Sequence, residues 1–296
     1  MNTASRRLAS RGLLPLLLVT ALVGTGSCQR PAPGAAAQSP ASVLDRVEKD
    51  KVLRVGIRPD HAPHSSVNEK GEWVGFDVDI ARAIAKQLGV HLDIVSVTEL
   101  TRISFTKDGK IDAAITSISK TWDRAREVAF SDTYFWSYQT FLVKKGSGIT
   151  TLRDLVGKKV AADRGGNADD NWLAWLGRNG FEGQSDVVQF GDKQAAVAAV
   201  RNGTVAGYAM DYEPLLKHAK ANPELEPLKQ EGGFGPKYDG VVVRHNDTKI
   251  LNAINFALQE IAVTGEYDRI FTKWYGPGSD TPLPQLGHIT VWPRNG

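Results

Sequence analysis

A stretch rich in hydroxyl side chains follows an apolar run in the first half of the chain. The run from Ile111 to Ile115 is typical of a buried strand, and four hydroxyl residues come after it: Thr116, Ser117, Ser119 and Thr121. Arg124 follows shortly afterwards. In open α/β sheets, ligands bind at the carboxyl ends of strands, where hydroxyls, backbone N–H groups and a guanidinium can hold a carboxylate. The spacing fits equally well a helix with Thr121 as its N-cap and a solvated Arg124 in its first turn.

Apolar periodicity predicts strands that alternate with helices around this stretch. Residues 52–57 and 91–97 alternate as strands do, and residues 80–88 between them have helical spacing closed by Gly89. The same order restarts later, with strands at 159–162, 187–188, 205–210 and 240–244 and helices at 169–176, 194–201 and 250–264. Two such series predict two α/β lobes rather than one continuous sheet.

The N-terminal residues predict a secretory signal over residues 1–27. Arginines at positions 6, 7 and 11 precede an apolar run over residues 13–23, which is shorter than the roughly 20 apolar residues of a membrane span. Small residues then lead to Cys28, the single cysteine of the chain. The sequence Thr25-Gly26-Ser27-Cys28 resembles a bacterial lipobox, so we expect Cys28 to carry a lipid. An ordinary signal peptide with a free thiol is the alternative.

Residues 28–44 predict a flexible tether between this cysteine and the folded part. Pro, Ala and Gly dominate the stretch, and such a composition buries too little apolar surface to offset its ordering entropy. The formal net charge of the whole chain is +3, and the three arginines of the signal account for that excess. Because the remainder has no net charge, we expect no basic surface for nucleic acid.

Three segments resemble bacterial extracellular solute-binding proteins of the polar amino-acid class. The first comprises residues 53–57 and 74–80, the second runs from the hydroxyl-rich stretch to Tyr134, and the third is 155–160 with Arg164 and Gly165 beyond it. The resemblance covers residues 48–275 and implies an α/β fold with two lobes joined by two crossing hinge strands, the periplasmic-binding-protein or Venus-flytrap fold.

The family fold also implies domain boundaries for this chain. Lobe one is expected at residues 45–137 plus 239–275, lobe two at 138–238, and a C-terminal tail at 276–296. The hinge candidates are residues 137–139 and 235–239. A ligand bound between such lobes closes them around itself.

The resemblance implies that several residues bind a zwitterion. Arg124 stands where the family arginine binds the α-carboxylate of the ligand, and Ser117 and Ser119 stand at positions that contact the same ligand. Asp211, after the predicted strand 205–210, stands where the family acid binds the α-ammonium group. Taken alone, Asp211 fits a strand-end acid that faces water better than a ligand-binding residue.

Two positions depart from the family pattern. Gly165-Gly166-Asn167 stands where Gly-Thr-Thr or Gly-Ser-Thr is usual. The change removes a hydroxyl at Gly166, but the amide of Asn167 can still donate to a carboxylate. His61 stands where an aromatic residue commonly covers the ligand. We therefore expect Gly165 and Asn167 in the site and a weaker stacking contribution.

Arg58 indicates the class of ligand side chain. It follows the strand 52–57 by one residue, where acidic-amino-acid binders of the family often carry Arg or Lys. We therefore expect glutamate or aspartate as the ligand, with Arg164 as a weaker second cation. A surface arginine preceding Pro59 is the alternative.

The resemblance implies an extracytoplasmic, lipid-anchored monomer that delivers an amino acid to an ABC permease, with no catalysis and no cofactor. His61 and His64 form a weak His-x-x-His pattern on a loop, so we expect no metal. Two alternatives stay open. One is a cyclohexadienyl-dehydratase-like enzyme on the same fold, with Glu99 or His61 as general acid. The other is a ligand-sensing subunit for a membrane receptor.

Overall fold

The structure is a computed structural model and describes residues 42–228 and 233–279. The predicted signal over residues 1–27, the predicted lipid attachment site Cys28, most of the tether and most of the tail lie outside the described residues. Within the described residues, no helix has both the length and the apolar character needed to span a bilayer.

Lobe one combines the first α/β series with two helices from the end of the chain. Its elements are α1 (Val43–Asp50), β1 (Val52–Ile57), β2 (Asp60–His61), β3 (Ser65–Val67), β4 (Trp73–Val74), α2 (Phe76–Leu88), β5 (His91–Ser96), α3 (Arg102–Lys107), β6 (Ala113–Ala114), α4 (Trp122–Ala125), α8 (Thr248–Val263) and α9 (Glu266–Tyr275). The strands β2, β3 and β4 form a small separate sheet.

Lobe two contains the second series, and two long strands connect the lobes. The elements of lobe two are the 3-10 turn η1 (Leu152–Leu155), β8 (Lys159–Asp163), α5 (Ala168–Arg178), β9 (Asp186–Phe190), α6 (Lys193–Arg201), β10 (Gly207–Asp211), α7 (Tyr212–Ala221) and β11 (Leu225–Pro227). The connecting strands are β7 (Val128–Lys144) and β12 (Gly235–Arg244).

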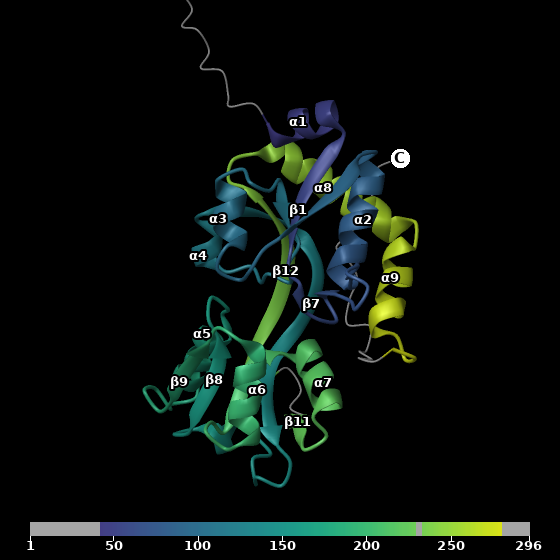
Figure 1. Cartoon of the computed structure of the whole chain (residues 1–296). Helices are drawn as coiled ribbons and strands as arrows, with labels where there is room; N and C mark the ends of the chain where they lie inside the picture. The colour runs from purple at the N-terminus through teal and green to yellow at the C-terminus, as the bar shows by residue number, and fades with distance from the viewer. Residues whose placement is uncertain (1–41, 229–232, 280–296) are drawn as a thin grey trace, which may run out of the picture. The chain divides into compact units, whose positions relative to one another are not determined.

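The strands form a sheet in the order β5-β1-β6-β12-β7-β10-β8-β9, with β11 also pairing with β7. The pairs within β5-β1-β6 and within β10-β8-β9 are parallel, whereas β7 and β12 pair antiparallel between these two groups. Figure 1 shows β7 and β12 side by side from one lobe into the other. The two predicted hinge segments pair directly, since Gly235 lies opposite Gln139 and Lys237 opposite Ser137. The chain thus has the two-lobe periplasmic-binding-protein fold.

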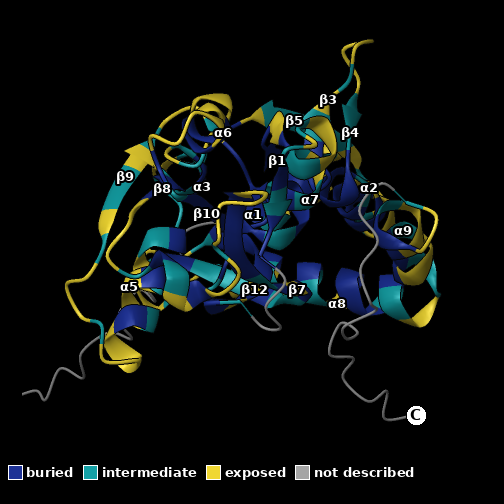
Figure 2. Ribbon diagram, turned by 90° about the horizontal axis from the view of Figure 1, so that it is seen from below, coloured by how far each residue is buried: buried dark blue, intermediate teal, exposed yellow. Residues whose placement is uncertain are grey.

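Each lobe has its own apolar core. In lobe one, Phe76 and Ile84 of α2 pack with Leu258 of α8 and with the buried strands. In lobe two, Trp172 of α5 packs against Phe141 of β7. Figure 2 shows buried residues along β7 and β12 and exposed residues on β9 and the outer loops. The strand ends that face the other lobe are therefore held by rigid cores on both sides.

The predicted elements are mostly found, with shifted ends. The strand at 52–57 and the helix end at Gly89, which has φ +65°, are confirmed. The predicted strand 111–115 is reduced to Ala113–Ala114, and the left-handed residue Ser117 follows it at φ +50°. The helix α1 starts at Val43, inside the predicted tether, because Ser42 caps it and Val47 is fully buried.

Candidate functional site

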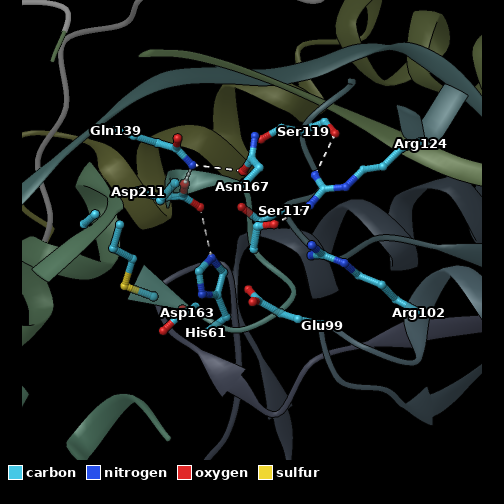
Figure 3. A pocket seen from close by; sticks show the side chains of 14 residues that line it. His61, Glu99, Arg102, Ser117, Ser119, Arg124, Gln139, Asp163, Asn167 and Asp211 are labelled. Carbon is cyan, nitrogen blue, oxygen red and sulfur yellow. Dashed lines mark hydrogen bonds and ion pairs between the residues drawn. The ribbon is translucent and has the colours of Figure 1, made fainter. Parts of the chain in front are cut away.

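A pocket lies where strand ends of both lobes meet, with about 350 Å³ of atom-free space, its open mouth included. The side chains that face it are mostly polar or charged (Figure 3), and the lining residues are His61, Glu99, Arg102, Ser117, Ser119, Arg124, Gln139, Asp163, Gly166, Asn167, Ala168, Ala209, Met210 and Asp211. Five of the seven residues predicted to bind ligand are among them. The exceptions are Arg58 and Gly165.

Arg124 reaches the pocket from the short helix α4. Thr121 caps this helix, because its hydroxyl accepts from the Arg124 backbone N–H at 3.3 Å. The guanidinium donates to the Ser119 carbonyl at 3.0 Å and to the Gly166 carbonyl of lobe two at 3.3 Å. Burial lowers its pKa, but a guanidinium stays charged. The N-cap interpretation and the binding interpretation are thus compatible, because the cap aims Arg124 into the pocket.

Asp211 comes from lobe two, at the end of β10 and directly before α7. Its carboxylate accepts from Gln139 Nε2 at 2.9 Å. Its Oδ2 lies 3.5 Å from His61 Nε2 and 3.5 Å from Lys237 Nζ. The side chain is 11% exposed, so this acid lines the pocket instead of facing bulk water.

Lys237 is a buried cation on the hinge strand β12 that the sequence analysis missed. Its ammonium donates to the Asp239 carboxylate and, at 2.7 Å, to the Ser117 hydroxyl. It also lies over the Phe135 ring, 5.2 Å from the centroid. With Asp211 and Asp239 beside one lysine, the cluster carries a net charge of about −1 when all three groups are ionised. This charge suits a ligand ammonium group next to Asp211.

An amide network positions Asn167 at the start of α5. Gln139 Nε2 donates to Asn167 Oδ1 at 3.1 Å as well as to Asp211, and Gln139 Oε1 accepts from Asn171 Nδ2 at 2.7 Å. Gly165 has φ +80°, and a Cβ atom there would lie 2.7 Å from Leu100 Cδ2 of lobe one. Gly165 therefore permits close approach of the lobes but does not line the pocket.

Arg58 occupies a different place from the one that the sequence suggested. Its side chain is 1% exposed, its Nε lies 3.3 Å from Asp60 Oδ1, and its NH1 bonds the Glu99 carboxylate. Burial alone would lower its pKa, but Glu99 and Asp60 outweigh burial and raise it. Arg58 lines a neighbouring pocket together with Arg164 and Lys193, and the two pockets share Glu99 and Asp163 as walls.

Arg102 is a second pocket arginine that the sequence analysis missed. It sits at the start of α3 and is 3% exposed. Its NH1 donates to the Thr116 carbonyl at 3.3 Å, and its Nε has no hydrogen-bond partner in the described part of the chain. The sequence signal was weak, because an arginine at the first turn of a short helix usually faces water.

The two histidines lie together, with His61 next to Asp211. Their rings stack with centroids 5.3 Å apart. Burial lowers the pKa of His61 well below its usual value and that of His64 to about 3, so both are neutral at pH 7. Across residues 42–228 and 233–279, no group of three or more His, Cys, Asp or Glu side chains could hold a metal ion.

Comparisons with known proteins agree with this architecture. The chain is 29% identical over 275 residues to the ABC transporter glutamine-binding protein GlnH of Bacillus subtilis. The alignment covers 91% of this chain and 97% of GlnH. It is 30% identical over 237 residues to an L-arginine-binding protein of Pseudomonas aeruginosa, covering 76% and 88% of the two chains.

Two solved structures are similar as well. The ancestral amino acid-binding protein AncCDT-1, a precursor of cyclohexadienyl dehydratase, has a TM-score of 0.69 and 30% identity, covering 79% of this chain and 99% of its own. Holo ArgBP from T. maritima has a TM-score of 0.66 and 33% identity, covering 75% and 97%. The model of the bacterial extracellular solute-binding proteins, family 3, matches residues 53–277. This chain belongs to that family.

Proposed function

We propose that this chain captures an α-amino acid between its lobes, outside the cytoplasmic membrane, and delivers it to an ABC importer. The observation that carries the proposal is that Arg124 of lobe one and Asp211 of lobe two line the same pocket. A guanidinium binds the α-carboxylate and a carboxylate binds the α-ammonium group, so one zwitterion satisfies both lobes. Two relatives are named as glutamine-binding and arginine-binding proteins, which supports the same class of ligand.

The test is a thermal-shift screen of the purified protein against the twenty amino acids, followed by calorimetry on those that raise its melting temperature. A ligand that binds only the folded state raises the apparent stability, by about 2.7 kcal/mol at a hundred times its Kd. Sugars and carboxylic acids without an amino group serve as negative controls. If no amino acid shifts the transition, the proposal is wrong.

We propose glutamate or aspartate as the ligand, the class that the sequence suggested. The relatives do not indicate one ligand side chain, since they are named for binding glutamine, arginine and histidine. Charge supports an acidic side chain. Arg102 and Arg124 both line the pocket, and in the described part of the chain neither has a carboxylate oxygen within the 4.0 Å of a salt bridge. The lining acids Glu99 and Asp163 lie beside Arg58 and Lys193 instead.

A dehydratase is the second candidate, because Asp163 lines the pocket and could supply a proton. Burial, followed by the nearby Glu99 charge, raises the pKa of Asp163 to about 6. The acids expected from the sequence fit less well. Burial tends to raise the pKa of Glu99, but the Arg58 charge outweighs burial and lowers it, so Glu99 is ionised at pH 7. His61 is neutral at pH 7 and therefore is not a general acid there.

We therefore propose binding without catalysis. Incubation of the purified protein with a prephenate-type cyclohexadienyl acid, monitored by the ultraviolet absorbance of an aromatic product, distinguishes the two candidates. Binding alone predicts no absorbance change above the rate of the uncatalysed reaction. Turnover that is lost in Asp163→Asn would establish the enzyme instead.

We also propose that the mature protein is a monomer anchored by a lipid on Cys28. The support for the anchor is the position of this single cysteine after the predicted secretory signal and before the predicted tether. Cys28→Ala should move the protein from the membrane fraction to the soluble extracytoplasmic fraction, and an unchanged distribution would contradict anchoring. Loss of ligand uptake in cells that lack the protein would favour an importer over a membrane receptor as the partner.

A further inference from the structure

Arg102 is a buried cation whose partners within the protein are weak. The one hydrogen bond of its side chain in the described residues is the 3.3 Å contact to the Thr116 carbonyl, which carries no formal charge. Burial lowers the pKa of Arg102 to about 10, so the side chain is still charged at neutral pH. A buried charge without a counter-charge is costly, and it is best compensated by an anion that enters the pocket.

Glu99 is the carboxylate in the best position to compensate Arg102 internally. Of the nearby charges, that of Glu99 raises the pKa of Arg102 the most. However, Glu99 Oε1 bonds NH1 of Arg58, whose Nε also pairs with Asp60 at 3.3 Å. Arg58 therefore holds Glu99 from the side of the neighbouring pocket. Figure 3 shows the Arg102 guanidinium and the Glu99 carboxylate entering the pocket near Ser117, the first from the start of α3 and the second from the turn just before it.

We propose that Arg102 binds the side-chain carboxylate of an acidic amino acid, and that Arg58 is a positioning residue that keeps Glu99 from neutralising Arg102. This inference rests on the proposed function, because it places the α-carboxylate on Arg124 and the α-ammonium on Asp211. It assigns the second carboxylate to a residue on α3 instead of to Arg58. Arg58 then acts on specificity without touching the ligand.

The physical reason for discrimination is the counter-charge. Glutamate brings a carboxylate to Arg102, whereas glutamine brings an amide oxygen with only a partial charge. Hydrogen bonds to charged groups are worth about 1.5–3 kcal/mol, so wild-type protein should prefer glutamate or aspartate over the matching amide by about 10- to 100-fold. Lysine and arginine would place like charges together and should bind still more weakly.

The first experiment is calorimetry with glutamate and glutamine on wild type, Arg102→Gln and Arg102→Lys. We expect Arg102→Gln to weaken glutamate binding by about 10- to 100-fold and to leave glutamine within about threefold. Arg102→Lys should keep part of the preference. The exposed Arg82, whose side chain is 51% exposed, provides the control variant Arg82→Gln, which should behave as wild type. Melting curves report whether each variant is folded.

The wild-type measurements separate failure of the inference from failure of the proposed function. If wild type binds no amino acid, the function is wrong. If it binds amino acids but favours glutamine or arginine over glutamate, the function stands and the inference is overturned. An equal loss of glutamate and glutamine in a folded Arg102→Gln protein also overturns the inference, because Arg102 would then bind a group common to both ligands.

The second experiment tests the indirect role of Arg58 by combining Arg58→Gln with Glu99→Gln. Alone, Arg58→Gln should weaken glutamate binding, because the released Glu99 can pair with Arg102. In the double variant that competitor is neutral, so the glutamate affinity should return to within about threefold of that of Glu99→Gln alone. Glu99→Gln should not rescue Arg102→Gln. Failure of rescue in a folded double variant would mean that Arg58 itself binds the carboxylate.

Discussion

Replacement of Lys237 by methionine should destabilise the protein strongly and in a pH-dependent way. Lys237 is 1% exposed, and its ammonium donates to the Asp239 carboxylate and to the Ser117 hydroxyl. The ammonium also lies 3.5 Å from the Asp211 carboxylate. Methionine matches the lysine side chain as far as Cε and lacks only the ammonium group, so the variant removes mainly the charge. Breaking a buried ion pair from one side typically costs about 3–5 kcal/mol.

The pH dependence follows from the acid that is left behind. Burial already raises the pKa of Asp239, even though Lys237 opposes this effect. Without the lysine, the pKa of Asp239 rises further in the folded state. The contribution of such a group to stability is present at low pH and is lost as the pH rises through the folded-state pKa. The variant should therefore lose less stability at pH 5 than at pH 8.

The assay is urea unfolding monitored by tryptophan fluorescence at pH 5 and pH 8. The matched control is Lys249→Met, since Lys249 pairs with Asp45 at 2.9 Å but its side chain is 62% exposed, so its loss should change stability little. A loss below about 1 kcal/mol for Lys237→Met, or an equal loss at both pH values, would refute the buried-charge interpretation.

Three further predictions concern binding, pH and packing. Arg124→Ala should weaken all amino-acid ligands by about 2–5 kcal/mol in calorimetry without unfolding the protein, because it leaves the α-carboxylate unpaired; unchanged affinity would remove it from the site. Burial raises the pKa of Glu213 to about 7, so its ionisation destabilises the fold as the pH rises from about 4.5 to 7. Across that pH window, the free energy of unfolding of Glu213→Gln, measured by urea titration, should rise relative to that of wild type by on the order of 3 kcal/mol. Trp172→Ala should cost about 3–5 kcal/mol in urea unfolding, because Trp172 is fully buried against Phe141, whereas the 86% exposed Trp122 should tolerate alanine.

The regular elements were predictable where apolar periodicity was clean. The strand at 52–57 and the helix capped by Gly89 depend on local pattern, and both are found. The 17-residue strand β7 was not predicted, because it passes from one core to the other and its pattern of burial changes along its length. The short elements β2 and β3 were missed because tertiary packing stabilises them, not propensity.

The site was predictable to the extent that it lies at strand ends. Ser117, Ser119, Arg124 and Asp211 reach one pocket from the positions that the resemblance implied. Residue type alone does not tell which cation is already neutralised, because the partners come from distant parts of the chain. Arg58 pairs with a glutamate 41 residues away, and this contact exists only in the folded protein.

The position of β12 in the sheet has a consequence for the order in which the protein can fold. β12 lies between β6 and β7, although about 90 residues that build lobe two separate it in sequence from β7. During synthesis, the sheet of lobe one can be completed only after residues 235–244, and helices α8 and α9, which cover its core, come later still. Pairing over such long separations slows folding. Completion of lobe one only after residues 235–275 have been made suits the extracellular location after which the family is named.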